Sequence, residues 1–245
     1  MIKAILFDVD GTLSETEEIH RKSFNRAFGV HGLTWHWSRA DYRKLLDVSG
    51  GKERIRFYLS THPDEFLYIS NVDQFVRAVH ETKTNIYTQL VEEGAAELRP
   101  GIRELIIQTT RLGIRRAIAT TTSLPNVEAL LGAAFGRDGM GLFETICAGD
   151  SVPNKKPAPD VYLATLKEMK LRPDECIAIE DSRNGLVAAT AAGIPTIVTP
   201  GIYTSDQKFD EAMLVTTDLK ASLPDILDEP TIASAFGSRI LTLQS

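Results

Sequence analysis

Residues 2–13 read IKAILFDVDGTL, an apolar run that ends abruptly in two aspartates and a glycine. The run Ile2–Phe7 has the length and composition of a buried strand, and Gly11 permits a sharp turn directly after it. Ligands of open parallel sheets bind beyond the carboxyl ends of the strands, where Asp8 and Asp10 would lie. Neighbouring carboxylates repel each other and lose hydration when buried, so the pair indicates a cation or a reaction that needs both groups. Taken alone, the same spacing also fits a polar turn.

The rest of the chain alternates strand-like runs with helical patterns. Further strand-like runs are Arg116–Ala119, with Ile114 before it, Ile177–Ile179, Thr196–Val198 and the weaker Phe143–Cys147. The helical patterns between them cover Ile102–Leu112, Asn126–Leu131, Pro159–Met169 and Asn184–Ala192. This βαβα order predicts an α/β fold with a doubly wound, Rossmann-like parallel sheet that has helices on both faces. Gly113 and Gly193 follow two of the helices, the position at which glycine commonly ends a helix.

Residues 15–96 break this alternation and contain no convincing strand. Their apolar residues recur with helical spacing, as in Ile19, Phe24, Ala27, Phe28 and, later, Val72, Phe75, Val76, Val79. We therefore predict an all-α cap domain over 15–96, inserted into a core domain formed by 1–14 and 97–245. An inserted unit with two connections is able to move as a hinged lid. We interpret Trp35 and Trp37 as part of its hydrophobic packing.

The composition is that of an ordinary globular protein: 245 residues, 43% hydrophobic and 24% charged, with a formal net charge of −6. The mildly acidic balance argues against a nucleic-acid groove or an anionic membrane surface. No apolar stretch approaches the ~20 residues of a membrane helix, and the apolar run at the N-terminus is too short for a signal peptide. We therefore predict a cytoplasmic protein, or the mature form of a targeted one, with no nucleic-acid or membrane partner.

The cysteines and the C-terminal stretch add little to a functional assignment. Cys147 and Cys176 lie in apolar, strand-like runs and are interpreted as buried free thiols. Pro224 and Pro230 interrupt residues 223–245, where we expect a loose helix or a tail. We expect the chain to act as a monomer.

Four separated motifs give the chain a resemblance to the haloacid dehalogenase (HAD) superfamily of phosphotransferases. In order they are Asp8-x-Asp10-Gly11-Thr12, a hydrophobic strand ending at Thr120, Lys156 ahead of a helix, and the acidic pair Glu180-Asp181 after a strand. The resemblance runs over the whole length of the chain and implies phosphate-ester chemistry with Mg²⁺. A dehalogenase is disfavoured, because that chemistry needs neither an acid–base aspartate at position 10 nor a metal-binding pair.

The resemblance assigns the reaction to a small set of side chains. Asp8 would attack phosphorus, and Asp10 would protonate the leaving oxygen and later activate water. Thr120 would donate its hydroxyl to one phosphoryl oxygen, and Lys156 would neutralise another. Lys155 is the alternative for this role, because the alignment of the motif could shift by one residue. For Lys156 itself, the alternative to a catalytic role is an ordinary solvated lysine in a loop.

The resemblance also implies a magnesium site built from oxygen ligands, which the hard Mg²⁺ ion prefers. Asp8, the backbone carbonyl of Asp10 and Asp181 would hold the ion, and Glu180 would ligate it directly or orient a bound water. An acidic pair is also favourable at a helix N-terminus on electrostatic grounds alone, and both readings can hold together.

The helical insertion resembles the small caps of the group that includes β-phosphoglucomutase and phosphoglycolate phosphatase, and most of all the CbbY-type xylulose-1,5-bisphosphate phosphatases. The stretches FDVDGTLSETEEIHRKSFN, SGGKER, ATTTSLPNVEAL and VPNKKPAPDVY carry that likeness. His20 aligns with a histidine tied to cap closure in β-phosphoglucomutase, and a partly exposed helix residue is the alternative. The remaining histidines lack ligand spacing and are expected to be structural or on the surface: His31, His36, His62 and His80.

A bisphosphate substrate needs a second anion site, which the cap would have to supply. Glycine exposes backbone N–H groups, and lysine and arginine add positive charge. The cap residues expected at this site are Tyr42, Arg43, Gly50, Gly51, Lys52 and Arg54. The residues expected to contact the sugar are Glu17, Thr121, Thr122, Ser123 and Asn126. The alternatives are a helix N-terminus with ordinary surface charge and plain helix caps.

The sequence therefore predicts a Mg²⁺-dependent phosphatase that acts on a small sugar phosphate through an aspartyl-phosphate intermediate. The CbbY-type resemblance alone points to xylulose 1,5-bisphosphate and to the Calvin cycle, as removal of a by-product that inhibits Rubisco. A β-phosphoglucomutase-like sugar phosphomutase, which would return the phosphoryl group to a sugar hydroxyl, is the alternative. A non-catalytic regulator that binds a phosphorylated metabolite is a third reading, disfavoured because every motif residue is present.

Overall fold

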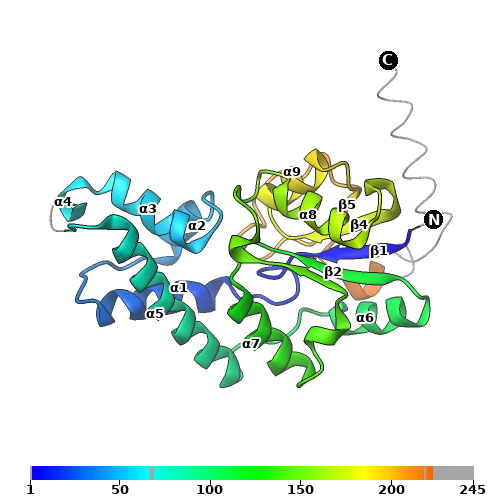
Figure 1. Cartoon of the computed structure of the whole chain (residues 1–245), viewed down its shortest axis with the longest axis horizontal. Helices are drawn as coiled ribbons and strands as arrows, with labels where there is room; N and C mark the ends of the chain where they lie inside the picture. The colour runs from blue at the N-terminus through cyan, green and yellow to red at the C-terminus, as the bar shows by residue number, and fades with distance from the viewer. Residues whose placement is uncertain (1, 67–68, 218, 223–245) are drawn as a thin grey trace, which may run out of the picture.

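The computed structural model describes residues 2–66, 69–217 and 219–222, and its centre is a six-stranded parallel sheet (Figure 1). The strands are β1 (Ala4–Phe7), β2 (Arg115–Ala119), β3 (Thr145–Cys147), β4 (Cys176–Glu180), β5 (Thr196–Val198) and β6 (Leu214–Val215). Their order in the sheet is β3-β2-β1-β4-β5-β6, and every neighbouring pair is parallel. The predicted α/β fold is confirmed. The strand β6 was not predicted, because its 2 residues are too few to form a pattern.

The order of the strands reverses between β1 and β4, since the chain builds β2 and β3 on one side of β1 before it crosses to the other. A crevice forms beyond the carboxyl ends of the strands at such a switch point. Asp8 and Asp10 follow β1, and Asp181 follows β4, so the topology alone brings these residues to one edge of the sheet.

Helices cover both faces of the sheet (Figure 1). They are α6 (Ile102–Arg111) and α7 (Leu124–Phe135) on one face, and α8 (Asp160–Met169) and α9 (Arg183–Ala191) on the other. Along β1, Ile5 and Phe7 pack in the cluster with α6 and α7, whereas Ala4 and Leu6 pack with α8 and α9. Because both faces are covered, the strand reads as a continuous apolar run rather than an alternating one. Short 3-10 turns occupy Met140–Leu142, Gly149–Ser151 and Pro173–Glu175.

The inserted residues form a separate helical layer beside the sheet, which we call the cap for its position beyond the carboxyl ends of the strands. Its helices are α1 (Glu17–Val30), α2 (Arg39–Leu45), α3 (Gly51–Thr61), α4 (Pro63–Phe66) and α5 (Val72–Glu92). They have a hydrophobic cluster of their own, in which Phe24 and Phe28 pack against Trp37 at ring-centre distances of 4.7 and 4.8 Å. Trp35 also lies in this cluster, so the predicted packing role of both tryptophans is confirmed.

The two connections between the helices and the sheet lie side by side. Ser14 pairs with Leu98 in an isolated antiparallel bridge, and the hydroxyl of Ser14 donates to the carbonyl of Glu97 over 2.6 Å. Arg99 donates from its guanidinium to the carbonyls of Thr199 and Pro200, at 2.6 and 3.1 Å, and to the carbonyl of Gly11. The second connection is thereby fastened to the turn after β1 and to the end of β5.

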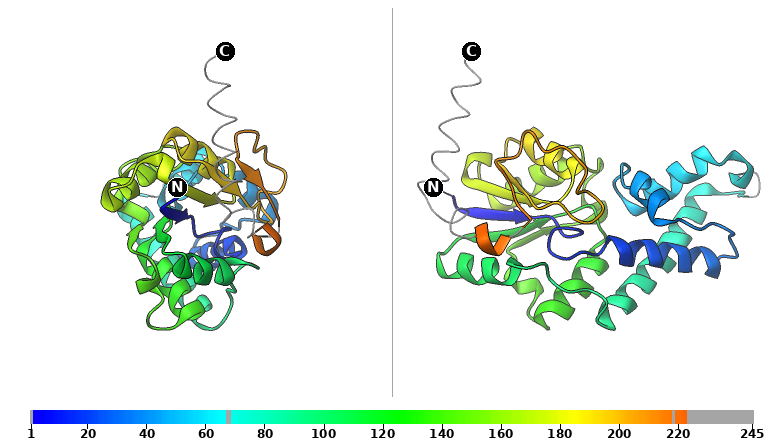
Figure 2. Two further views of the ribbon diagram at one scale, coloured as in Figure 1. Left: turned by 90° about the vertical axis from the view of Figure 1, so that its right-hand side faces the viewer. Right: turned by 180° about the vertical axis from the view of Figure 1, so that it is seen from behind.

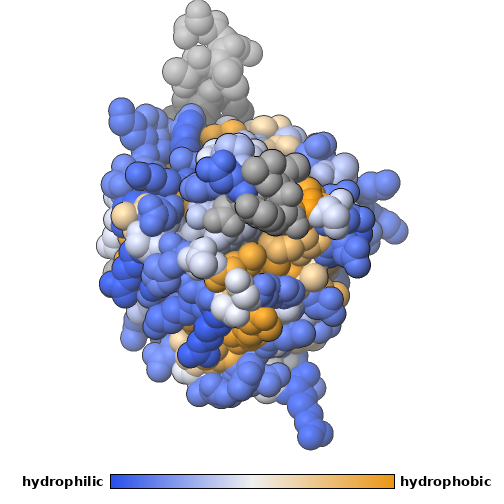
Figure 3. Space-filling model, turned by 90° about the vertical axis from the view of Figure 1, so that its left-hand side faces the viewer, coloured by the Kyte–Doolittle hydropathy of each residue, from blue (hydrophilic) through white to orange (hydrophobic). Residues whose placement is uncertain are grey.

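The outer end of the cap exposes a group of hydrophobic side chains (Figure 3). A hollow of about 390 Å³ in the cap is lined by Leu33, Trp35, Ile69 and Phe75 together with polar neighbours.

No helix in the described ranges combines the length and apolar composition that a bilayer crossing requires. Cys147 and Cys176 are free and buried, as predicted. The tail expected over residues 223–245 lies outside the described residues.

Candidate active site

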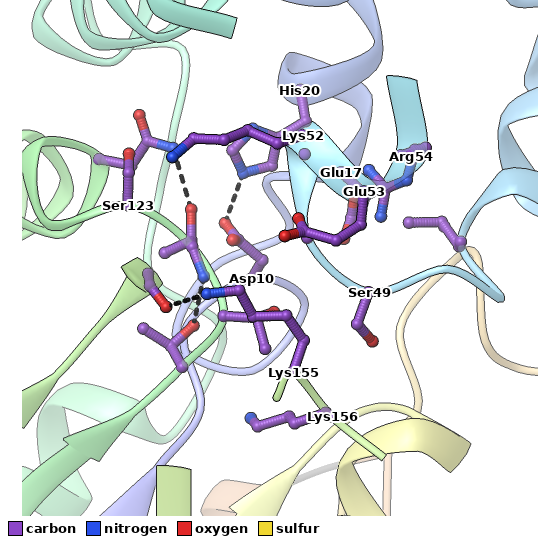
Figure 4. A pocket seen from close by; sticks show the side chains of 18 of the residues that line it. Asp10, Glu17, His20, Ser49, Lys52, Glu53, Arg54, Ser123, Lys155 and Lys156 are labelled. Carbon is purple, nitrogen blue, oxygen red and sulfur yellow. Dashed lines mark hydrogen bonds and ion pairs between the residues drawn. The ribbon is translucent and has the colours of Figure 1, made fainter. Parts of the chain in front are cut away.

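A cavity of about 920 Å³ lies between the carboxyl ends of the central strands and the cap helices α1, α3 and α5 (Figure 4). It is lined on the core side by Asp8, Asp10, Thr120, Lys156 and Asp181, which come from four separate stretches of the chain. The residues of all the predicted core motifs therefore meet at one place, with Glu180 buried directly behind them.

Asp8 pairs with Lys156 at the floor of this cavity. The ammonium nitrogen of Lys156 lies 2.6 Å from Oδ1 of Asp8 and 2.6 Å from Oε1 of Glu180, and all three residues are buried. The hydroxyl of Tyr162 also donates to Oε1 of Glu180. Burial raises the pKa of Asp8 to about 7, against the opposing charge of Lys156. Burial alone would lower the pKa of Lys156, but the charges of Asp8 and Glu180 outweigh it and raise that pKa.

The carboxylates here outnumber the cation that faces them. Asp8, Glu180 and Asp181 each offer an oxygen, and these oxygens lie within 4.8 Å of one another. Burial and the charge of Asp8 raise the pKa of Asp181 well above its usual value. Oε2 of Glu180 is buried with no hydrogen-bond partner among the described residues. Carboxylate oxygens in this arrangement are suitable ligands for a hard divalent cation, which would relieve both the repulsion and the unpaired oxygen.

The turn after β1 brings its backbone unusually close to this cluster. Gly11 has φ of 81°, in the left-handed region that glycine adopts at little cost. A Cβ atom at this position would overlap the carboxylate of Asp181. Glycine is therefore required here both by the backbone conformation and by the closeness of Asp181.

Asp10 faces the cap and is held by it. Nε2 of His20 lies 2.8 Å from Oδ1 of Asp10 (Figure 4). The hydroxyl of Thr16 donates to the same oxygen over 2.5 Å. On the other side of the ring, Nζ of Lys83 lies 2.6 Å from Nδ1 of His20. An ammonium group has no acceptor, so Nδ1 accepts from Lys83 and Nε2–H donates to Asp10. The ring of His20 also stacks on Tyr87, with centres 4.2 Å apart.

The pKa values of Asp10 and Lys83, the two groups at the ends of this chain of contacts, are both shifted. Burial by itself would raise the pKa of Asp10, but its interactions with His20, Thr16 and Lys83 outweigh this effect and hold that pKa well below its usual value. Burial lowers the pKa of Lys83 to about 7. Asp10 is thus stabilised as a carboxylate by a buried lysine acting through a histidine.

The structure places most of the residues predicted to contact the substrate around the same cavity. Those that line it are Glu17, His20, Gly50, Gly51, Lys52, Arg54, Thr121, Thr122, Ser123 and Asn126. Tyr42 and Arg43 are not among the lining residues. The hydroxyl of Tyr42 donates to Glu17 over 2.8 Å, and Arg43 contacts Asp206 and the carbonyl of Ile202 in the core, at 2.8 and 2.9 Å.

The guanidinium of Arg54 is engaged by the cap itself. It donates to the carbonyls of Leu45 and Val48 at 3.1 and 3.3 Å and to the hydroxyl of Tyr42 at 2.8 Å. Arg54 is 7% exposed, so little of this residue is open to a ligand. Its contacts brace the segment between α2 and α3, which ends at Gly50.

Lys52 spans the gap between the cap and the core. Its ammonium group bonds to Asp150, which follows β3, and the same carboxylate lies 3.2 Å from Nζ of Lys155 (Figure 4). Lys155 also donates to the carbonyl of Gly149. The cavity therefore has a pair of cations, Lys52 and Lys155, apart from the single Lys156 at its floor.

The sequence analysis missed several residues that face this cavity. His80, expected to be structural or on the surface, lines the cavity, and burial lowers its pKa to about 3. Lys83 and Asp150 were not singled out. His80, Lys83, Thr84 and Tyr87 recur at helical spacing on α5, and this periodicity was the available signal. Asp150 had no such signal, because only the position of the cap places Lys52 against it.

Comparison of the sequence with known proteins identifies a family that it matches. Residues 2–193 match the haloacid dehalogenase-like hydrolases. The chain is 49% identical over 209 residues to the protein CbbY of Cereibacter sphaeroides, covering 85% of this chain and 89% of that protein.

Solved structures agree with the sequence comparison. CbbY from Rhodobacter sphaeroides in complex with phosphate superimposes with a TM-score of 0.84 at 45% identity, over 91% of this chain and 96% of that chain. A mutant of CbbY from the same organism, in complex with xylulose-(1,5)bisphosphate, gives a TM-score of 0.83 at 45% identity, over 90% and 96% of the two chains. In sequence and in fold, this chain belongs to the haloacid dehalogenase-like hydrolases.

Proposed function

We propose that the protein is a Mg²⁺-dependent phosphatase that hydrolyses xylulose 1,5-bisphosphate or a closely similar sugar bisphosphate. The observation that carries the proposal is the presence of two separate cationic positions in one cavity. Lys156 lies beside Asp8 at the floor, and Lys52 and Lys155 lie at the boundary between the cap and the core. A substrate with one phosphoryl group at each end fits this distribution of charge.

The first half of the reaction transfers the phosphoryl group to Asp8. An oxygen of Asp8 attacks phosphorus in line, and the bond from phosphorus to the sugar oxygen breaks. Thr120 and Lys156 stabilise the charge on the phosphoryl oxygens. Asp10 gives its proton to the leaving sugar oxygen. A phosphoryl group bound beside Asp8 adds negative charge, which raises the pKa of Asp10 and favours the protonated form that this step needs.

The second half returns the phosphoryl group to water. Asp10, now a carboxylate, accepts a proton from a water molecule whose oxygen attacks phosphorus. The bond from phosphorus to Asp8 breaks, inorganic phosphate leaves, and Asp10 is protonated again. The hydrogen bonds from His20 and Thr16 stabilise the carboxylate form of Asp10, which is the form that activates water.

Asp8, Asp181 and the backbone carbonyl of Asp10 would hold the magnesium ion, with Glu180 as a direct or water-mediated ligand. The ion would neutralise charge on the phosphoryl oxygens. The excess of buried carboxylates and the unpaired oxygen of Glu180 support this assignment. Lys156 remains paired with Asp8 and Glu180, so it orients both carboxylates for the ion and the phosphoryl group.

The distal phosphate would lie near Lys52 and Lys155, with the backbone N–H groups of Gly50 and Gly51 adding further donors. Lys52 then exchanges its partner Asp150 for the phosphate. The sugar hydroxyls would face Glu17 and the polar residues 121–123. Residues 15–96 would act as the cap that covers the substrate. A relative at 45% identity, solved with xylulose-(1,5)bisphosphate, supports this choice of sugar.

The test is phosphate release from xylulose 1,5-bisphosphate, ribulose 1,5-bisphosphate and β-glucose 1-phosphate, with EDTA and Asp8→Asn as blanks. We expect preference for the xylulose compound and loss of activity in both blanks. Conversion of the glucose ester to its 6-phosphate without phosphate release would instead establish a phosphomutase. Absence of turnover with every ester would favour a protein that only binds phosphorylated metabolites.

A further inference from the structure

The loop after β5 is a part of the core that enters the cap. Tyr203, on this loop, is 7% exposed and belongs to the hydrophobic cluster of the cap helices. Its ring meets that of Tyr42 edge-on, with centres 5.7 Å apart and planes at 83°. Its hydroxyl donates to Oε2 of Glu18 on α1 over 2.5 Å. Figure 2 (right) shows the loop, in orange, extending from the sheet toward the blue helices of the cap.

The same loop is fastened to the acidic cluster by the residue that follows. Thr204 is 4% exposed, and its hydroxyl donates to the backbone carbonyl of Asp181 over 2.7 Å. That hydroxyl also accepts from the backbone N–H of Gly201 over 2.8 Å. Consecutive residues of the loop therefore contact the cap and the acidic cluster, so the cap cannot shift against Tyr203 without straining the loop that carries Thr204.

A second residue of the cap, Arg43, also contacts the loop after β5. Arg43 on α2 donates to Asp206 and to the carbonyl of Ile202, and its guanidinium carbon lies 5.8 Å from the ring centre of Tyr203. Arg43 and Tyr42 are neighbours in sequence, so α2 contacts both the ring of Tyr203 and the backbone beside it. This accounts for the position of Arg43, which lies away from the cavity.

The contact reaches the substrate cavity through Tyr42 and Glu17. The hydroxyl of Tyr42 donates to Oε2 of Glu17, and it accepts from Arg54. Glu17 lines the cavity, whereas Tyr42 and Tyr203 do not. The ring of Tyr203 therefore supports the tyrosine that fixes the direction of the Glu17 carboxylate.

We propose that Tyr203 is a positioning residue that holds the cap over the core with Glu17 directed at the sugar. Withdrawing the ring from the cap cluster exposes apolar surface and breaks the bond to Glu18, so the closed arrangement is favoured while the ring is in place. Sugar substrates, which need the cap, depend on this contact. Small aryl phosphates, which carry no sugar for Glu17 to contact, depend on it less, through the bond from His20 to Asp10 alone. The inference rests on the proposed function for its substrate but not for its geometry.

The experiment compares Tyr203→Ala and Tyr203→Phe with Ile202→Ala, an exposed neighbour that contributes its carbonyl but not its side chain to Arg43. For Tyr203→Ala we expect kcat/KM for xylulose 1,5-bisphosphate to fall about tenfold or more, as when a hydrogen bond to a charged group and its packing are lost. Activity on p-nitrophenyl phosphate should fall less, since this ester loses only the effect of the cap on Asp10 and not the direction of Glu17. Tyr203→Phe, which keeps the ring, should recover part of the loss.

Equal loss on both substrates would show that Tyr203 only supports the fold, and unchanged activity on the sugar substrate would show that the contact is dispensable. Small-angle X-ray scattering without substrate gives an independent readout. We expect a larger radius of gyration for Tyr203→Ala than for the wild type and Ile202→Ala, and an unchanged radius would overturn the proposal. If the wild type hydrolyses the aryl ester but no sugar phosphate, the proposed function fails while the scattering result still decides the role of Tyr203.

Discussion

His20 donates a hydrogen bond from Nε2 to Oδ1 of Asp10 across 2.8 Å, and this bond connects a cap helix directly to the carboxylate next to the nucleophile. Lys83, on another cap helix, holds the opposite side of the same ring. The protonation of Asp10 thus depends on the cap being in place over the core. In the proposed phosphatase, water would therefore be activated most effectively when the site is covered.

Replacing His20 tests this connection. We expect His20→Ala to lower kcat by about 10- to 100-fold, the usual size of a lost contribution to acid–base catalysis, with little change in KM. Steady-state kinetics on the sugar bisphosphate measure the effect. His36→Ala, an exposed histidine of the same cap, serves as the matched control and should be unaffected. An effect confined to KM would mean that His20 binds substrate rather than tuning Asp10.

The burial of Lys83 predicts how the stability of the protein changes with pH. Its pKa is about 7 in the folded protein against 10.5 as the ordinary value, so the unfolded chain binds the proton more tightly. Burial of this lysine lowers the free energy of unfolding by its full amount below about pH 7, and this destabilisation decreases as the pH rises toward 10.5. We expect Lys83→Met to stabilise the protein by about 2 kcal/mol near neutral pH, after the loss of the bond to His20, and by less in alkali.

Urea unfolding of Lys83→Met and wild type at about pH 6.5 and about pH 9.5 measures this difference. Both proteins are studied in EDTA, so that bound cations do not contribute. A stabilisation that is the same at both pH values, or a destabilisation near neutral pH, would show that the burial of charged Lys83 is not costly. Activity of the same variant should fall, since Nδ1 of His20 loses its donor.

Lys52 is expected to bind the distal phosphate. Lys52→Ala should raise KM for the bisphosphate about tenfold or more, because an ionic contact to phosphate is lost. Activity on a sugar monophosphate should change little. Lys22→Ala, an exposed lysine of α1, is the matched control. Equal loss on the monophosphate and the bisphosphate would assign Lys52 to closing the cap against Asp150 instead.

The acidic cluster predicts a stabilising effect of magnesium that does not depend on activity. Mg²⁺ should raise the Tm of the wild-type protein by a few degrees relative to EDTA, since the ion binds only the folded cluster. Asp181→Asn should lose most of this increase. Asp174→Asn changes a carboxylate that is 60% exposed and outside the cluster, and should keep it. A shift of equal size in both variants would place the cation elsewhere.

The sheet and the floor of the site were accessible from sequence because they depend on local pattern and topology. The apolar run before Asp8 predicts a strand, and parallel strands bring their carboxyl ends together wherever the helices lie. The cap side was less accessible. Lys83 reaches His20, and Lys52 reaches Asp150, only through the position of one helical layer over the sheet. The sequence also does not show that the guanidinium of Arg54, at the wall of the cavity, donates to the carbonyls of Leu45 and Val48.

Capture of the phosphorylated enzyme tests most directly whether Asp8 is the nucleophile. The protein is mixed with Mg²⁺ and substrate labelled in the phosphoryl group, quenched in acid within the first turnover, digested and mapped by mass spectrometry. We expect a phosphoryl group on Asp8, absent in Asp8→Asn and formed no more slowly than phosphate is released. Release of labelled phosphate without any labelled peptide, or with the label on a residue other than Asp8, would contradict it.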